Sequence, residues 1–361
     1  MANSYQPRSE STDISYSKKM TDIAKGVGIF ALLIHHSIAN EPGQPIVLTA
    51  SNLTTLLAAS GKMCVSLFMI LSGYGLTCSF RAKGQGMARF VGGHIYKIWS
   101  SYILIYVLVL LVWLACGTKP SSFYGTGPLA IVYMIKDMLG MSNLLIVTPT
   151  ANGVWWYMEA CFTSYMLFPL FMKIIDKGNS ATIVLLIVSY LPWIWYFINA
   201  GWAWHTDREI YYFFSFILGM ACARYGVFDR LVAYRHSHPV LMMSITFAAL
   251  LLSIAIRSQL CLLADPLLAL AVIAFTSCWL AGPAAVAAPL AALGVVSGDI
   301  FMFHTMVIHL LSEQMFGSSV VRLLVILGTC WAAAELLRLC KHITGYDAMM
   351  ASLPRRLWKA S

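Results

Sequence analysis

Apolar runs long enough to cross a membrane recur along the whole chain, separated by short stretches that are charged or contain Gly and Pro. A helix needs about 20 mainly apolar residues to cross a hydrocarbon core about 30 Å thick. The pattern predicts such helices over residues 22–39, 56–80, 98–116, 154–172, 181–200, 210–223, 239–256, 260–280, 289–311 and 320–339. We therefore expect an all-α, polytopic integral membrane protein with about ten transmembrane helices.

Three segments fall outside these runs. Residues 1–17 are polar and rich in Ser, which predicts a disordered cytoplasmic tail. Residues 343–361 form a basic cytoplasmic tail, and residues 18–342 form one membrane domain. Within 117–153, the sequence LAIVYMIKDMLG is amphipathic and interrupted by Lys136 and Asp137. This pattern is typical of a helix on the membrane surface or of a re-entrant piece.

The composition excludes an ordinary soluble domain. Of the 361 residues, 59% are hydrophobic and 11% are charged, whereas soluble domains carry about 25% charged residues. The net charge of +9 could suggest a nucleic-acid partner. Basic residues gather in the cytoplasmic loops of membrane proteins, so we expect a lipid bilayer and no nucleic acid as partner. The nine cysteines form no CxxC pair and no Cys/His spacing suited to zinc, so no metal site is predicted.

The distribution of Lys and Arg predicts the orientation. With both ends in the cytoplasm, seventeen of these residues fall on inside segments. Four fall outside, namely Lys119, Lys136, Arg208 and Arg257, and three lie within span ends. Short cytoplasmic loops carry the excess of basic residues, so the bias predicts N-in and C-in.

The first apolar run, TDIAKGVGIFALLIHHS, joins a cation to two adjacent histidines. Lys25 and His36 are 11 steps apart, which on an α-helix leaves their side chains about 20° apart in azimuth and roughly 16 Å apart along the axis. His35 lies about 80° away from Lys25. Ionisable groups inside a membrane are costly and usually functional, and imidazole can accept and return a proton near neutral pH.

Each of these two residues also has a plain structural interpretation. Lys25 could be an ordinary basic flank on the cytoplasmic side, or a contact for an anionic ligand such as a nucleotide phosphate. His36 could form a satisfied hydrogen bond between helices, or act as the base that activates a hydroxyl. The placement of both on one face favours the functional interpretation.

The fourth run, GVWWYMEACFTSYMLFP, places a carboxylate among aromatic residues. The aromatic residues, Trp156 among them, are typical of an interfacial belt. Glu159 is harder to explain this way, since a carboxylate inside the outer half of a membrane needs a partner or a function. It could orient a histidine or handle protons itself.

Two further stretches contain polar candidates. Ser72-Gly73-Tyr74-Gly75 could serve close helix packing, or could open the backbone for a ligand. In SGDIFMFHTMVIH, Asp299 is expected to cap a helix or half-helix. His304 could be a hydrogen-bonded structural residue or part of a site.

Taken in order, these pieces resemble the acyltransferase 3 family of membrane O-acyltransferases, over about residues 20–340. The family has Arg followed after ten residues by His in its first span, and here the pattern is Lys25-x10-His36. Lys keeps the charge but lacks the planar fork of Arg. FMILSGYGLT is similar to the aromatic-rich SGF motif, VWWYMEACFTSY to the W-x-x-x-E segment, and GDIFMFHTMV to the late S-x-x-x-Y-x-x-H segment.

The resemblance implies a multi-pass enzyme of the plasma membrane that uses acyl-CoA, in particular acetyl-CoA, as co-substrate and holds no bound cofactor. The acceptor would be a hydroxyl of an extracytoplasmic or lipid-linked sugar or glycan. The implied catalytic group is His36 as base, His35 beside it, and Glu159 as acid partner. The implied substrate-binding residues are Lys25, Ser72, Tyr74, Trp156 and His304.

The main alternative is a transporter or flippase of a glycan precursor, with His36 and Glu159 on a proton path. It predicts spans broken by Pro or Gly in matched halves of the chain, and the sequence does not show such a pattern.

Overall fold

The computed structural model describes residues 15–39, 53–143, 147–200, 209–311, 315–316 and 318–357. The predicted disordered tail lies almost wholly outside this part of the chain, as do the last residues of the basic tail. Every regular element in the described residues is a helix, which confirms the predicted class.

The first half of the chain contains α1 (Lys18–Ile34) with a π-helical continuation (His35–Ala39), α2 (Leu53–Ser60), a 3-10 turn (Gly61–Met63), α3 (Cys64–Lys83), α4 (Met87–Ala115), α5 (Ser121–Tyr124), α6 (Pro128–Met138) and α7 (Trp156–Ile175). The second half contains α8 (Asn179–Ala200), a 3-10 turn (Glu209–Tyr212), α9 (Phe213–Arg224), α10 (Val227–Ser237), α11 (Pro239–Leu260), a 3-10 turn (Cys261–Ala264), α12 (Asp265–Phe275), a π-turn (Thr276–Leu280), α13 (Ala284–Val295), α14 (Ser297–Leu310), α15 (Ser319–Ile343) and α16 (Tyr346–Leu357).

Six stretches of the described chain are long and apolar enough to cross a membrane. They are Leu56–Lys83, Met87–Ala115, Trp156–Ile175, Pro239–Leu260, Leu262–Leu280 and Val320–Ile343. Two bent pairs, α9 with α10 and α13 with α14, raise the count to eight if each pair is one span. The membrane class is thereby supported, whereas the count of ten stays a prediction.

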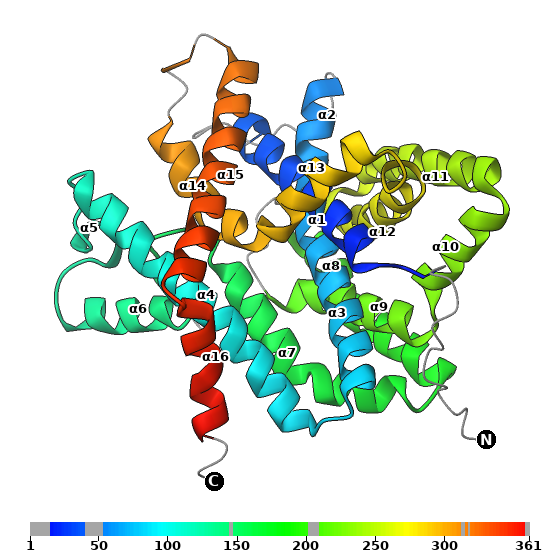
Figure 1. Ribbon diagram of the computed structural model, residues 1–361, viewed down its shortest axis with the longest axis horizontal. Helices are drawn as coiled ribbons and strands as arrows, with labels where there is room; N and C mark the ends of the chain where they lie inside the picture. Colours follow the sequence, from blue (N-terminus) through cyan, green and yellow to red (C-terminus); the bar gives the residue numbers. More distant parts are fainter. Residues whose placement is uncertain are drawn as a thin grey trace.

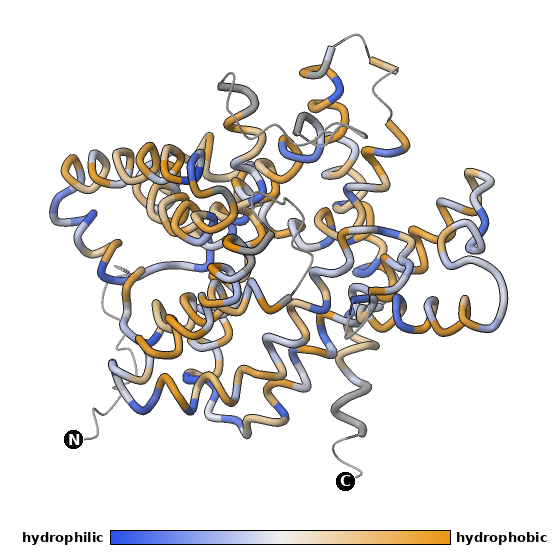
Figure 2. The backbone as a smooth tube through the Cα atoms, turned by 180° about the vertical axis from the view of Figure 1, so that it is seen from behind, coloured by the Kyte–Doolittle hydropathy of each residue, from blue (hydrophilic) through white to orange (hydrophobic). Residues whose placement is uncertain are grey.

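Large apolar side chains cover the outside of the bundle as well as its interior. Val240, Ile343 and Ile198 expose 76%, 73% and 71% of their surfaces. Figure 2 shows hydrophobic residues along nearly every helix, with hydrophilic residues gathered toward the turns. Such an apolar exterior suits a lipid environment, because water would make it a liability.

Two pairs of helices approach so closely that a side chain is missing at the contact. A Cβ on Gly26 of α1 would overlap the Leu290 carbonyl of α13, and one on Gly294 of α13 would overlap the Asp22 carbonyl of α1. In the same way, Gly73 of α3 lies against Phe216 of α9. Small residues allow such backbone contacts between membrane helices, so the packing interpretation of Gly73 is the one the structure supports.

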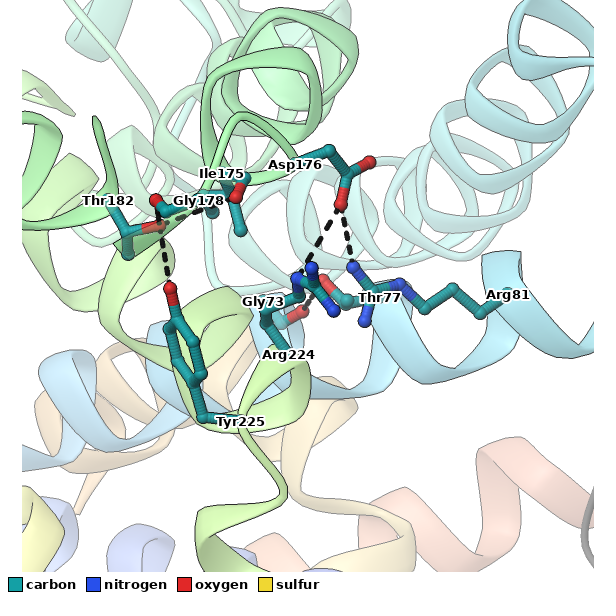
Figure 3. A network of polar contacts seen from close by, with 9 residues as sticks. All are labelled: Gly73, Thr77, Arg81, Ile175, Asp176, Gly178, Thr182, Arg224 and Tyr225. Carbon is teal, nitrogen blue, oxygen red and sulfur yellow. Dashed lines mark hydrogen bonds and ion pairs between the residues drawn. The ribbon is translucent and has the colours of Figure 1, made fainter. Parts of the chain in front are cut away.

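An ion-pair network joins three helix ends at one end of the bundle (Figure 3). Asp176, directly after α7, accepts a hydrogen bond from Arg81 of α3 at 2.9 Å and lies 3.8 Å from the Nε of Arg224 of α9. Nearby, the Tyr225 hydroxyl donates to Thr182 Oγ1 at 3.2 Å. The turns after α3, α7 and α9 therefore lie close together at one end of the bundle. The distribution of Lys and Arg assigns all three of these loops to the cytoplasmic side, and loops on one side of a membrane must lie at the same end of the bundle.

The run predicted as one span over 289–311 is two helices, α13 and α14, bent by 75°. The prediction that Asp299 caps a helix is wrong, because Val296 is at the N-cap and no side chain caps α14. Asp299 lies in the first turn, where it accepts a hydrogen bond from Ser101 at 3.0 Å and pairs with Lys341 at 3.2 Å. An ion pair to α15 and a hydrogen bond to α4 thus hold the start of α14.

Helices α5 and α6 stand out to one side of the bundle (Figure 1). Leu129 and Ile131 of α6 expose 62% and 63% of their surfaces, which suits a helix lying in the membrane interface. Asp137, which the sequence suggested as a polar interruption of a surface helix, is instead fully buried. Its side chain therefore faces the protein.

The two glycines of the SGYG stretch give a matched test of this packing. Gly73→Ala should lower stability by about 1–3 kcal/mol, because its Cβ would overlap the Phe216 carbonyl. Gly75→Ala should have little effect, since no atom of the described residues lies within 4 Å of a Cβ there. The measurement is the thermal unfolding midpoint of both variants in detergent, and equal losses would contradict this account.

Candidate functional site

The first helix and its π-helical end place the candidate residues Lys25 and His36. Ser17 caps α1, its Oγ accepting a hydrogen bond from the Met20 N–H at 3.2 Å. The helix is regular as far as Ile34, after which His35–Ala39 adopts the wider π turn. Single π turns inside α-helices are frequent at functional sites. A Cβ on Gly61 would overlap the Ala31 carbonyl, so the turn after α2 lies directly against this end of α1.

Three histidine rings meet at the π turn. The His36 ring lies 4.9 Å from the His304 ring of α14 and 5.0 Å from the His35 ring, measured between centroids. His304 is fully buried, and His35 is nearly so. The structure thus brings together His36, His35 and His304, which sequence reasoning had assigned to two different roles.

Hydrogen bonds fix the tautomers of two of these rings. His35 Nδ1 lies 2.9 Å from the Ala58 carbonyl, and His304 Nδ1 lies 2.8 Å from the Phe301 carbonyl. A carbonyl can only accept, so each Nδ1 carries the proton, and each neutral ring keeps a lone pair at Nε2. Within the described part of the chain, the buried His304 Nε2 has no hydrogen-bond partner.

A cavity of about 440 Å³ lies beside α14, and its lining residues include Phe301 and Met302 of that helix but none of the three clustered histidines. Its wall includes Lys25, Ser72, Tyr157, Cys161 and Phe301. The Phe301 ring lies 4.4 Å from the Tyr157 ring and 5.8 Å from the His304 ring. Lys25 and His36 therefore both lie toward α14, in keeping with the single helix face that their spacing predicts.

A second hollow of about 800 Å³ opens beside the first. The two share wall residues of α4, among them His94, Lys97 and Ser101. The lining of the second hollow includes five cations, Lys83, Arg89, Lys97, Arg338 and Lys341, and two carboxylates, Asp299 and Asp347. A positively charged hollow thus leads into a mainly apolar one, an arrangement that suits a ligand with an anionic head and a neutral tail.

Glu159 points to another part of the molecule. It is 1% exposed, and its Oε2 accepts a hydrogen bond from the Asn143 N–H at 2.9 Å. Tyr157, two residues earlier, lines the first cavity, and two residues are about 200° apart on a helix. Glu159 therefore lies on the opposite side of α7 from that cavity. Its partnership with His36 stays a prediction.

Tyr74 and Trp156 lie in aromatic clusters of their own. The Tyr74 ring is 5.5 Å from Tyr16 and 4.8 Å from Phe228. Trp156 stacks on Tyr212 at 5.3 Å. The binding roles predicted for these two residues stay untested, and the contacts here are those of packed side chains.

The segment between α6 and α7 is held by a buried carboxylate. We call residues 147–155 the α6–α7 strap. Asp137 Oδ1 accepts hydrogen bonds from Ser142 at 2.7 Å and Thr150 at 2.8 Å. Its Oδ2 accepts from Tyr124 at 2.6 Å and from the Ala151 N–H at 2.9 Å. Burial raises the pKa of the Asp137 carboxyl above its ordinary value, and these donors offset only part of that rise.

The α6–α7 strap in turn is hydrogen-bonded to α14 close to His304. Asn152 Nδ2 and Trp155 Nε1 both donate to the Met302 carbonyl, at 3.0 and 2.9 Å. The Thr305 hydroxyl donates to Asn152 Oδ1. Sequence reasoning missed Asp137, Asn152 and Trp155 as part of this region. The only local signal was Trp155 beside Trp156, because the contacts join residues about 150 positions apart.

No group of three or more His, Cys, Asp or Glu placed to hold a metal ion occurs in the described residues. With the geometry known, comparison with known proteins identifies the family. A family model described as an acyltransferase domain matches residues 21–334. No curated protein and no solved structure gave a significant match.

The Asp137 network yields a test against an exposed carboxylate. Asp137→Asn should cost about 1.5–3 kcal/mol, because hydrogen bonds to a buried charged group are lost. Asp176→Asn should cost at most about 1 kcal/mol, since Asp176 is 52% exposed and such ion pairs contribute little. Thermal unfolding in detergent measures both, and limited proteolysis within 139–153 should increase only in Asp137→Asn. Similar losses in the two variants would count against a special role for this network.

Proposed function

Because the chain belongs to the acyltransferase domain family, which its match over residues 21–334 shows, we propose that it is a membrane-embedded O-acyltransferase of the plasma membrane. In this proposal the acyl group is acetyl and the donor is cytoplasmic acetyl-CoA. The acceptor is a hydroxyl of an extracytoplasmic or lipid-linked sugar or glycan.

The proposal includes ten spans with both termini in the cytoplasm. Two observations support the orientation. The first is the strong excess of Lys and Arg on the loops assigned to the inside. The second is the Arg81, Asp176 and Arg224 network, which gathers three of those loops at one end of the bundle.

The observation that carries the proposal is the pair of adjacent hollows that share lining residues of α4 and α14. The phosphates of a coenzyme A nucleotide need several cations, which the larger hollow supplies. The narrow pantetheine arm suits the inner cavity, where Lys25 lies in the wall. Phe301 lines that cavity, its ring centroid lies 5.8 Å from that of His304, and the His304 ring lies 4.9 Å from the His36 ring. A thioester placed there would lie close to an imidazole.

The proposed chemistry is one acyl transfer. His36 takes the proton from the acceptor hydroxyl, and the oxygen attacks the thioester carbonyl. The bond from the carbonyl carbon to sulfur then breaks, and coenzyme A leaves as a thiolate that accepts a proton. His304 helps to place the reacting groups. Glu159, although it lies on the opposite side of α7 from the inner cavity, is kept in this proposal as the acid partner, which would offset from a distance the positive charge that forms on the imidazole. His35, whose Nδ1 is bound to Ala58, supports the π turn.

A proton-coupled transporter of a glycan precursor is the second candidate. The two bent helix pairs favour it, since broken helices are a feature of transporter sites. The two candidates differ in one product, because only the acyltransferase leaves a covalent acetyl group on the glycan.

Lys25 tests the donor side. Lys25→Glu should weaken the use of acetyl-CoA, seen as a rise in KM, because it places a negative charge in the wall of the inner cavity, beside the hollow proposed for the phosphates. Lys25→Arg should be tolerated or better, since it keeps the positive charge and adds the planar fork of the guanidinium. The assay is labelled acetyl-CoA added to membranes, normalised to inserted protein. An unchanged KM in Lys25→Glu would mean that Lys25 does not bind the donor and serves only as a basic residue that sets the orientation of the first span in the membrane.

The two adjacent histidines test the reaction itself. His36→Ala should reduce transfer of labelled acetyl to glycan by about 10²–10⁴-fold, because general base catalysis is lost. His35→Ala should cost clearly less, since its ring is bound to a backbone carbonyl. If wild-type membranes acetylate no glycan, the enzyme proposal fails. If His35→Ala is inactive and His36→Ala is not, the assignment of the base is wrong.

A further inference from the structure

We propose that the α6–α7 strap is a positioning device for His304, with Asn152 as the residue that holds α14 in register and Asp137 as the anchor of the strap. The inference rests on the proposed function, because it assigns the strap a role in acyl transfer. The sequence analysis assigned neither Asp137 nor Asn152 to a functional site, and neither residue lines the two hollows proposed for acetyl-CoA.

Asn152 uses both ends of its side-chain amide on α14. Its Nδ2 donates to the carbonyl of Met302 at 3.0 Å, and its Oδ1 accepts from the hydroxyl of Thr305. Met302 and Thr305 lie on either side of His304 in the sequence. A group that binds both fixes the axial position and the rotation of the helical turn that carries the imidazole.

Further hydrogen bonds from residues of the α6–α7 strap support the contact between Asn152 and α14. Trp155 Nε1 donates to the same Met302 carbonyl at 2.9 Å, and Trp155 is 1% exposed. Asn152 Oδ1 also accepts from the Val154 N–H at 3.3 Å, which orders the strap around the amide. Asp137 binds Thr150 and Ala151, the two residues before Asn152. A continuous set of hydrogen bonds therefore runs from Asp137 to Met302 and Thr305, which lie on either side of His304 in the sequence.

α14 has a physical need for this support. It begins at a 75° bend after α13, so the preceding helix does not continue its axis. The ion pair between Asp299 and Lys341 fixes its first turn. The hydrogen bonds from the α6–α7 strap fix the turn that carries His304. The buried His304 Nε2 must keep its direction toward the reacting groups, and a displacement of about 1 Å can cost about 10²-fold in rate.

The test uses isosteric variants with matched controls. Asn152→Asp removes the donor and sets a negative charge against a carbonyl, and Thr305→Val removes only the hydroxyl. Thr305→Ser keeps that hydroxyl. Thr182→Val removes a buried hydroxyl from the distant network of Figure 3, and so controls for a general loss of stability.

The first readout needs no activity. Purified full-length protein is treated with diethyl pyrocarbonate, which acylates an unprotonated imidazole nitrogen, and modification of each histidine is followed by peptide mass spectrometry. We expect His304 to react several-fold faster in Asn152→Asp and Thr305→Val than in wild type. Exposed His309 on the same helix should be unchanged, and Thr305→Ser and Thr182→Val should match wild type.

The second readout is the split between kcat and KM for acetyl-CoA. Asn152→Asp should lower kcat about 10- to 100-fold with KM unchanged, because His304, which helps to place the reacting groups, is displaced while the cation-lined hollow is intact. Unchanged His304 reactivity in both Asn152→Asp and Thr305→Val overturns the inference, and so does a wild-type kcat in Asn152→Asp. If wild type transfers no acetyl group, the proposed enzyme function fails, and with it the strap's role in catalysis. The reactivity of His304 then decides separately whether the strap holds the imidazole.

Discussion

Direct backbone contact between α1 and α13, made at Gly26 and Gly294, sets the geometry on which the candidate site depends. With no side chain at either contact, the two helices can approach only in one register. In that register the end of α13 lies beside Asp22, near the start of α1, and α14 begins there. The ring contact between His36 and His304 lies about two to three helical turns away from these glycines, and it depends both on this packing and on the direction that α14 takes.

The bend between α13 and α14 gives this packing its chemical result. A straight helix over 284–310 would carry His304 farther along the axis of α13, away from the end of α1. The bend instead turns α14 so that Phe301 faces the inner cavity while His304 faces His36. Two sets of contacts hold α14 in this direction. At the bend, Asp299 pairs with Lys341 and accepts a hydrogen bond from Ser101. One turn farther along, the Asn152 side chain binds Met302 and Thr305.

Charge is divided between the two sides of this arrangement. The cations gather in the hollow lined by α4, α15 and α16, whereas the buried histidines lie beyond an apolar cavity. Burying polar groups is costly unless they are hydrogen-bonded. His35 and His304 each form a hydrogen bond to a backbone carbonyl, and Asp137 accepts hydrogen bonds from four donors, which offsets the cost of burying these groups. The side chains of His35, His304 and Asp137 are therefore held in fixed orientations.

The sequence by itself determined the helical membrane class and the approximate limits of most spans, because these follow from local apolar runs. It also singled out Lys25, His36 and His304, since ionisable residues are rare within such runs. The tertiary structure alone decided which of them meet. It turned Glu159 toward Asn143, placed Tyr74 against Tyr16 and Phe228, and buried Asp137. These outcomes depend on residues tens to hundreds of positions away, on a bend at Val296 and on a π turn at His35, and no local pattern of hydrophobic and polar residues encodes such contacts.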